Sequence, residues 1–223
     1  MHKLFYLTAA FLIAVCTFCP EQLSALDKRQ IKLAAKEAKK LEKEGWKTMN
    51  LPIQTQLEET WEMQAQRDED GFKSFIVKEV VAISNSYSAA QSQAENIAKI
   101  RIAGDIGSSV ASLTDIALKN EEISAADAAT VAKIAEEAKV LVSQELGRIV
   151  TGQTLYRITP EKKYEVRVVV LYNMRKAMQL AHDVMMQQMQ NEISENAVKV
   201  MNGVLGSNNL IGAYEESGFD ETL

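Results

Sequence analysis

Residues 148–171 read RIVTGQTLYRITPEKKYEVRVVVL, and this stretch decides the fold class. Two segments rich in β-branched and aromatic residues, 148–158 and 164–171, flank a turn at residues 159–162, a pattern typical of an antiparallel hairpin. In the second segment, charged residues alternate with valines from Glu165 to Val168, which predicts one polar and one apolar face. The hairpin is the strongest β signal in the chain.

A third strand and several helices are predicted around this hairpin. The β-branched run at residues 74–83 predicts the strand, and an alanine-rich helix is expected to follow it. Ser124, with Asp127 three residues later, predicts the start of a further helix. Between Ser108 and Leu118 the periodicity fits either a strand or a helix. We therefore expect an α+β domain over residues 67–200, in which long helices pack on an antiparallel sheet of three or four strands.

An N-terminal helical extension, residues 26–66, is expected before this domain. Its first helix begins at Asp27, a favourable N-cap, and stops at Gly45. One face of that helix is basic, with lysine or arginine at positions 28, 29, 32, 36, 39, 40 and 43. Such a face can touch anionic lipid headgroups. Because the opposite apolar stripe is mostly alanine, we favour an ordinary solvated face.

The first 25 residues have the layout of a secretory signal peptide. A single cation, Lys3, precedes the apolar run at residues 4–18, and Pro20 begins a polar stretch. The apolar run is shorter than the roughly 20 residues that a membrane-spanning helix needs. Cleavage after Ala25 would leave a mature chain without cysteine.

A second processing route remains open at Cys16. The preceding residues Ile13, Ala14 and Val15 come near the pattern that a lipoprotein signal peptidase reads, although valine is larger than the usual small residue. Cys16 is therefore a candidate for lipid modification. The cleaved, unmodified form is the preferred prediction.

Composition and charge argue against several functions. The formal net charge is −5, so the chain lacks the broad positive field on which nucleic-acid binding depends. Both cysteines lie within the predicted signal, and His182 is the only histidine after it. The sequence therefore predicts no catalytic residue, no metal site and no cofactor. Glu58 and Glu62, a possible pair of catalytic carboxylates, are better explained as neighbours on a solvated helix.

Residues 67–71, RDEDG, have the acidic spacing of part of a calcium-binding loop. The match fails because Gln66 stands at the first ligand position and Val77 at the twelfth, where a glutamate belongs. We expect a polar turn that leads into the strand.

The helix expected after Asn173 carries a stripe of methionines that includes Met178, Met185 and Met189. Core packing is the favoured role for this stripe. Methionine also lines adaptable binding surfaces, so these three residues are candidates for an interaction surface.

The last residues, 201–223, are rich in glycine and asparagine and predict a flexible tail. Tyr214 and Phe219 in this tail are candidate partner contacts.

The order of these elements resembles the small conserved envelope lipoproteins first noted in Helicobacter-type outer membranes, whose domain also forms the N-terminal part of the flagellar protein FlgT. The likeness covers about Lys36 to Gln190 and includes the Tyr-x-Val-x-Val strand that begins at Tyr164. The opening EAKKLEKEGW, Glu37 to Trp46, is similar to exported Bacteroidota members. The resemblance implies an α+β domain, favours a strand within Ser108 to Leu118, implies a lipid anchor in some relatives and carries over no catalytic residue.

Together these features predict an exported protein of the periplasm or of the periplasmic face of the outer membrane. We expect a non-enzymatic interaction or structural protein, whose partners are other envelope proteins or further copies of itself. Membrane contact is expected only through a lipid anchor or the basic helix. The alternatives are a periplasmic protein that binds a small ligand or a lipid, and a hydrolase that needs no cysteine.

Overall fold

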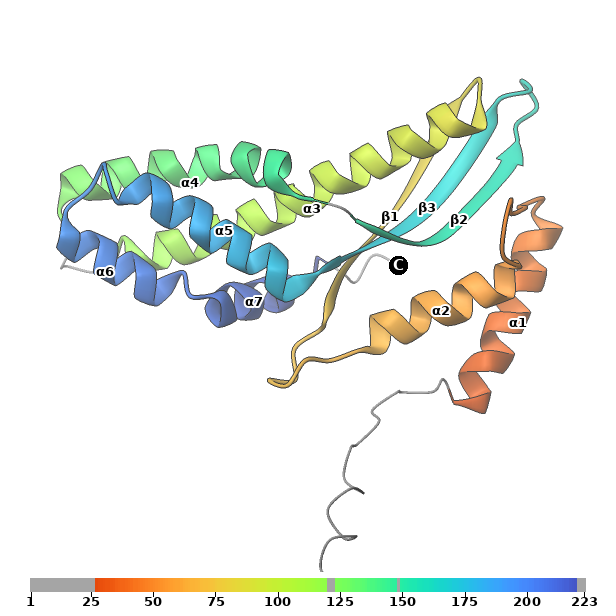
Figure 1. Ribbon diagram of the computed structural model, residues 1–223, viewed down its shortest axis with the longest axis horizontal. Helices are drawn as coiled ribbons and strands as arrows, with labels where there is room; N and C mark the ends of the chain where they lie inside the picture. Colours follow the sequence, from red (N-terminus) through yellow and green to blue (C-terminus); the bar gives the residue numbers. More distant parts are fainter. Residues whose placement is uncertain (1–26, 120–122, 148, 220–223) are drawn as a thin grey trace, which may run out of the picture.

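The computed structural model describes residues 27–119, 123–147 and 149–219. Within these ranges seven helices and three strands follow one another (Figure 1). Their order is α1 (Lys28–Lys43), α2 (Ile53–Ala65), β1 (Phe75–Ser84), α3 (Tyr87–Ala117), α4 (Ala125–Glu145), β2 (Val150–Ile158), β3 (Tyr164–Asn173), α5 (Met174–Met189), α6 (Glu195–Val204) and α7 (Ser207–Glu216). The predicted signal peptide, with Cys16, lies outside the described residues.

The three strands form one antiparallel sheet in the order β1-β3-β2. The predicted hairpin is confirmed as β2 and β3. Central strand β3 pairs on both sides, and Val168 lies opposite Val80 of β1 and Thr154 of β2. The α+β class is therefore confirmed, with three strands in the described part of the chain.

The first half of α3 covers one face of the sheet (Figure 1). Ala90, Ala94 and Ala98 are fully buried there, each one helical turn from the next. Their short side chains let the helix lie close to the strands, and Val166 and Val168 of β3 belong to the same core. This layer is the main apolar core of the protein.

The second half of α3 continues past the sheet and packs with α4, α5, α6 and α7 (Figure 1). The strand favoured within Ser108 to Leu118 is therefore wrong, since Tyr87–Ala117 is one helix. Val110, Thr114 and Ala117 are buried at helical spacing. A strand would bury alternate residues instead, so contact with the neighbouring helices decides the conformation.

The opposite face of the sheet is covered in part by α2, against which α1 packs. Gln56 of α2 accepts a hydrogen bond from the backbone N–H of Thr154 on β2 at 2.7 Å. α1 ends at Lys43, and Gly45, the predicted stop, follows with a φ of +87° in the left-handed region. None of the helices in the described ranges is long and apolar enough to cross a membrane.

Each outer strand is contacted at one residue of its outer edge by another part of the chain. The N–H and C=O groups of Lys47, in the segment after α1, pair with those of Tyr156 on β2, both at 2.8 Å. On the other edge, the guanidinium of Arg101 donates to the backbone oxygen of Glu79 on β1 at 3.2 Å. Loops and cations of this kind restrain unwanted strand pairing.

The C-terminal segment is helical where the sequence predicts a flexible tail. Leu210 and Ile211 of α7 are fully buried and Tyr214 is 1% exposed. These three residues form an apolar helical face that joins the main core, so the predicted tail is wrong for residues 201–219. The domain extends past residue 200, and residues 220–223 lie outside the described part.

Candidate functional site

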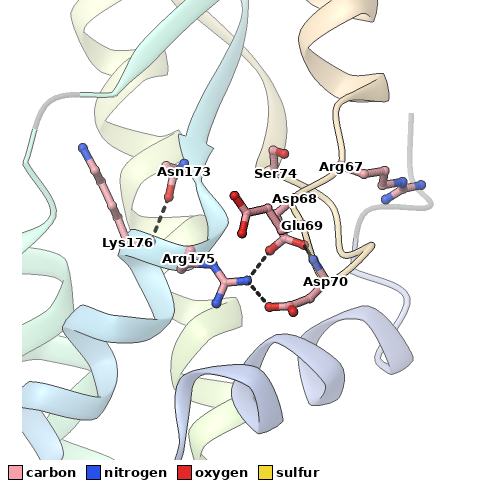
Figure 2. A pocket seen from close by; sticks show the side chains of 8 residues that line it. All are labelled: Arg67, Asp68, Glu69, Asp70, Ser74, Asn173, Arg175 and Lys176. Carbon is pink, nitrogen blue, oxygen red and sulfur yellow. Dashed lines mark hydrogen bonds and ion pairs between the residues drawn. The ribbon is translucent and has the colours of Figure 1, made fainter. Parts of the chain in front are cut away.

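A polar hollow of about 740 Å³ lies where the turn before β1 meets the start of α5 (Figure 2). Three acidic and three basic side chains line it, together with Ser74 and Asn173. The charged residues are Arg67, Asp68, Glu69, Asp70, Arg175 and Lys176. We take this hollow as the candidate site because it gathers charged groups from distant parts of the chain.

Local hydrogen bonds build the two sides of the hollow. On one side, the Asp68 carboxylate accepts from the backbone N–H groups of Asp70 and Phe72, both at 3.0 Å, which closes the turn. On the other side, Asn173 caps α5 by accepting from the N–H of Lys176 at 2.8 Å. These caps fix the backbone from which Arg175 extends.

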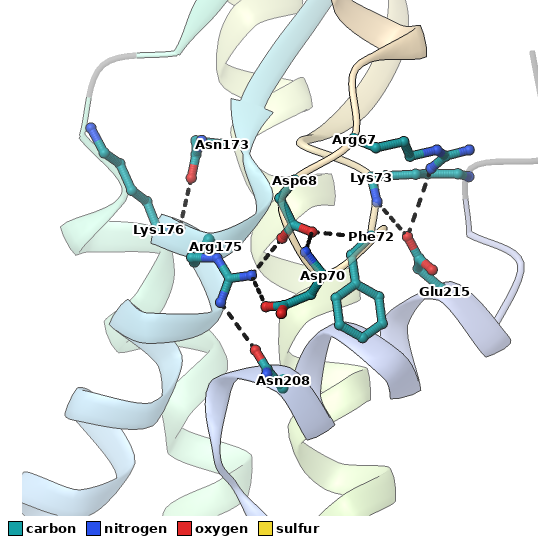
Figure 3. Close-up of polar contacts among 10 residues, drawn as sticks. All are labelled: Arg67, Asp68, Asp70, Phe72, Lys73, Asn173, Arg175, Lys176, Asn208 and Glu215. Atoms are coloured by element: carbon teal, nitrogen blue, oxygen red, sulfur yellow. Dashed lines mark hydrogen bonds and ion pairs between the residues drawn. The ribbon is translucent and has the colours of Figure 1, made fainter. Parts of the chain in front are cut away.

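Arg175 connects three segments of the protein (Figure 3). One terminal nitrogen, Nη2, lies 2.6 Å from Oδ2 of Asp68 and 2.7 Å from Oδ2 of Asp70. The other, Nη1, donates to Oδ1 of Asn208 on α7 at 3.0 Å. One guanidinium therefore links the turn, α5 and α7.

A second contact between the turn and α7 lies beside the first (Figure 3). The carboxylate of Glu215 accepts from the backbone N–H of Lys73 at 2.7 Å and lies 3.9 Å from the guanidinium of Arg67. The C-terminal helix is thus fastened to the turn at two points.

The pKa values follow from these contacts. Desolvation acts to raise the pKa of Asp68, but hydrogen bonds from Arg175 and from the N–H groups of Phe72 and Asp70 outweigh it. The pKa of Asp68 therefore lies below its usual range, and the hydrogen bonds that Arg175 donates to Asp68 and Asp70 raise the pKa of Arg175. A carboxylate held ionised in this way is poorly suited to exchange protons near neutral pH.

The acidic residues of the turn are directed at a cation that the protein itself supplies. Asp68 and Asp70 both point toward Arg175, so their charge is compensated inside the chain (Figure 3). In the described ranges no cluster of three or more His, Cys, Asp or Glu side chains is placed to hold a metal ion. The arrangement suits a structural junction better than a reaction centre.

The methionines proposed as an interaction surface lie in the core. Met178, Met185 and Met189 are fully buried between α5 and its neighbours. They offer no surface to a partner in this structure, so the sequence hypothesis of an exposed methionine patch is wrong and the core-packing interpretation is correct. The stripe is amphipathic because α5 packs against the rest of the helical layer.

The two aromatic residues proposed as partner contacts are also placed differently. Tyr214 is 1% exposed, and Phe219 is partly buried with its ring centre 5.6 Å from that of Tyr214. They pack on each other rather than project from a tail. Cys16, the remaining candidate, falls outside the described residues.

His182 and the glutamate pair have ordinary local partners. His182 lies between Asp183, 3.1 Å from Nδ1, and Asn202, 2.9 Å from Nε2. Glu58 accepts from the side chain of Gln54 one helical turn away, at 2.8 Å. Neither group belongs to the hollow.

A second surface of interest is the part of the sheet that α2 leaves open. Val81 and Ile83 of β1 are 44% and 52% exposed on this face. Their cross-strand neighbours on β3 are Arg167 and Glu165. We call the residues Glu79, Val81, Ile83, Arg157, Glu165 and Arg167 the outer sheet patch.

The charges of the outer sheet patch are compensated pairwise. Arg167 lies 2.6 Å from Glu79, and Arg157 lies 2.6 Å from Glu165. The guanidinium of Arg157 also stacks on the Trp46 ring, 4.5 Å from its centre. The patch therefore combines two exposed aliphatic side chains with a neutral border.

The sequence pointed to the RDEDG turn but did not reveal its partner. Arg175 follows the strongly predicted strand, and its contact with Asp68 spans 107 positions of the chain. Comparison of the chain with protein-family models, curated proteins and solved structures gave no match. The resemblance to the envelope lipoproteins stays a prediction.

Proposed function

We propose that the protein is an exported, non-enzymatic interaction protein of the cell envelope that associates with a second copy of itself through the outer sheet patch. The observation that carries this proposal is the exposure of Val81 and Ile83, side by side on one strand. Export is supported by the three-part layout of residues 1–25.

The apolar part of the patch gives a reason for association. Val81 and Ile83 are about half exposed, so full burial of each would contribute on the order of 1 kcal/mol. A two-fold contact buries both residues from both copies. Because association has a large entropic cost, we expect a weak dimer whose population depends on concentration.

The charged part of the patch favours a copy of the same chain as the occupant. The protein carries a formal net charge of −5, so two copies repel each other at long range. The outer sheet patch contains two acidic and two basic residues, already paired. Two patches can therefore meet without a net charge between them.

The test is sedimentation equilibrium over a wide range of concentrations. The protein, as recovered from the envelope of expressing cells, is compared with the double variant Val81→Lys, Ile83→Lys. The matched control is Ile116→Lys, Val140→Lys, which places the same charges at two exposed positions of α3 and α4. Thermal melts establish that all three proteins are folded.

Dimers of the wild type and of the control, together with a monomeric patch variant, would support the proposal. A wild type that stays monomeric at every concentration would contradict it. So would a folded patch variant that dimerises as strongly as the control.

The export step has its own measurement. Intact mass of the recovered protein distinguishes cleavage after Ala25 from a lipidated Cys16. A chain that keeps residues 1–25 and stays in the cytoplasm would contradict the proposed location in the cell envelope.

A further inference from the structure

We propose that the basic face of α1 binds the anionic headgroups of a membrane surface. The inference is independent of self-association, because α1 shares no residue with the outer sheet patch. It concerns the seven cations of α1, which we call the α1 basic face: Lys28, Arg29, Lys32, Lys36, Lys39, Lys40 and Lys43.

The seven cations lie on one side of the helix. Ala34, Ala38 and Leu41 form the buried stripe that packs against α2. At 3.6 residues per turn, the seven cationic positions fall within an arc of roughly 120° opposite that stripe. All seven residues are exposed. The apolar side of α1 is therefore used in the fold, and the basic side is left for an external contact.

Few acidic residues accompany these cations. Lys40 lies 3.2 Å from Glu37, and in the described part of the chain no other residue of the α1 basic face has an ion-pair partner. In α4 and α6, by contrast, Lys133 and Lys199 each pair with a glutamate one turn away. A solvated helix of this protein would be expected to follow the same mixed pattern.

The one-sided charge also weakens the helix. Four pairs of cations stand four positions apart: Lys28 with Lys32, Lys32 with Lys36, Lys36 with Lys40, and Lys39 with Lys43. Like charges at this spacing destabilise a helix. An anionic partner at this face would offset the repulsion.

The overall charge distribution favours a planar partner. α1 carries seven cations and two acidic residues, whereas the whole chain is at −5, so the rest of the protein is strongly acidic. Near an anionic surface, α1 is attracted and the remainder is repelled, which fixes one orientation. α1 lies at the outer side of the molecule, with α2 between it and the sheet (Figure 1).

Lipid headgroups suit this face better than a nucleic acid. Anionic lipids move in the plane of a bilayer and can gather beneath an arc of cations. The phosphates of a rigid duplex cannot rearrange, and a duplex that contacts α1 must also approach the acidic remainder. We therefore assign the α1 basic face to anionic phospholipid.

The experiment measures binding to vesicles by flotation. One vesicle preparation contains three parts phosphatidylcholine to one part phosphatidylglycerol, and the other contains phosphatidylcholine alone. The protein recovered from the envelope is compared with Lys32→Gln, Lys36→Gln, Lys43→Gln. The control Lys133→Gln, Lys162→Gln, Lys199→Gln makes the same change in net charge at exposed positions elsewhere. Intact mass confirms that all three proteins have the same N-terminus.

We expect the α1 variant to bind the anionic vesicles about 100-fold more weakly than the control, as three lost lysine contacts predict. Binding of the wild type should weaken with added salt and be much lower on neutral vesicles. Because the substitutions remove like-charge repulsion, the variant should remain folded in a thermal melt.

Two outcomes would overturn the proposal. The first is equal binding of the α1 variant and the control to anionic vesicles, which includes the case in which the N-terminal segment alone holds the protein on the bilayer. The second is binding of a short DNA duplex at least as tight as binding of the anionic vesicles, which would assign the face to nucleic acid. Failure of self-association leaves both readouts unchanged.

Discussion

Lys78 of β1 and Asp105 of α3 form an ion pair between the sheet and its covering helix, with Nζ 2.6 Å from Oδ2. The two side chains are only 12% and 19% exposed. Lys78 also donates to the backbone oxygen of Phe219 at 2.8 Å, so the same ammonium reaches the end of the C-terminal segment. A charged pair in this layer makes the packing of sheet, α3 and C-terminus interdependent.

We expect Lys78→Met to lower the free energy of unfolding by about 2–4 kcal/mol, because it leaves the Asp105 carboxylate largely buried without its cation. The double variant Lys78→Met, Asp105→Leu should recover most of that loss, since two apolar residues replace the pair. Urea unfolding of the two single variants and the double variant measures the coupling. Strictly additive losses would show that the pair is not coupled.

The burial of the methionine stripe predicts a large cost of truncation. Met185→Ala should lower the free energy of unfolding by about 2–5 kcal/mol, because the fully buried side chain leaves a cavity. The control is Met49→Ala, at a methionine that is 54% exposed, where a change within about 0.5 kcal/mol is expected. Equal effects in chemical denaturation would place Met185 at the surface.

Two glycines should respond in opposite directions to alanine. A Cβ at Gly152, in the irregular part of β2, would lie 2.6 Å from Leu171 and 2.7 Å from Thr60, both buried side chains. We expect Gly152→Ala to destabilise by about 1–3 kcal/mol. Gly104 in α3 has no heavy atom within 4 Å of such a Cβ, and Gly104→Ala should stabilise by about 0.5–1 kcal/mol. Thermal melts of both variants check the signs.

Asp127 predicts a pH dependence of stability. Its carboxylate accepts hydrogen bonds from the side chain and the backbone N–H of Ser194 and from the side chain of Ser124, which hold its pKa below the usual range. A lowered folded-state pKa contributes stability that is present above the pKa of the unfolded chain and is lost as the pH falls through the folded value. Asp127→Asn should melt below the wild type at neutral pH, and the difference should shrink in acid.

Melting curves of the wild type and of Asp127→Asn, recorded from neutral pH to about pH 3, measure how the difference in melting temperature shrinks. Ser194→Ala removes one hydrogen-bond donor of the same network and also the N-cap of α6, so only part of its destabilisation should vary with pH. A difference between wild type and Asp127→Asn that stays constant with pH would exclude the carboxylate as its source.

Arg175→Gln tests the junction around the polar hollow. The variant loses the contacts with Asp68 and Asp70 and leaves two acidic residues side by side, so the melting temperature should fall by a few degrees. Hydrogen exchange should increase most in the turn at residues 67–73 and in α7, which Arg175 connects. Lys176→Gln, one position along, is the control. Unchanged exchange in α7 would show that the Asn208 contact does not hold that helix.

The parts of the fold that sequence predicts are those set by local chemistry. The β-branched run in β3 favours a strand wherever it occurs, and Ser124, Asn173 and Gly45 are end signals that act within one helical turn. The segment from Ser108 to Leu118 is different, because burial against neighbouring helices makes it helical, and two of these, α6 and α7, begin only at Glu195 and Ser207. No local pattern contains that information.

Only one side of the candidate site, the acidic turn, could be predicted from the sequence. The RDEDG turn is visible in the sequence, but its ion-pair partner is not. That partner is Arg175, and its position depends on how β3 ends and α5 begins. For the methionine stripe, the pattern is visible in the sequence but its role is not. An amphipathic helix has the same spacing whether its apolar side meets the core or a partner, and only the packed structure distinguishes the two.

The contacts that Lys47 and Arg101 make at the two margins of the sheet affect how copies of this protein can accumulate. At Tyr156 and Glu79 these contacts occupy backbone groups to which a strand of another copy would otherwise bind. In the dimer that we propose, two copies meet face to face across a two-fold axis, and assembly stops at two. Together, the contacts at the sheet margins and the proposed two-fold dimer would favour assemblies of two copies over fibres.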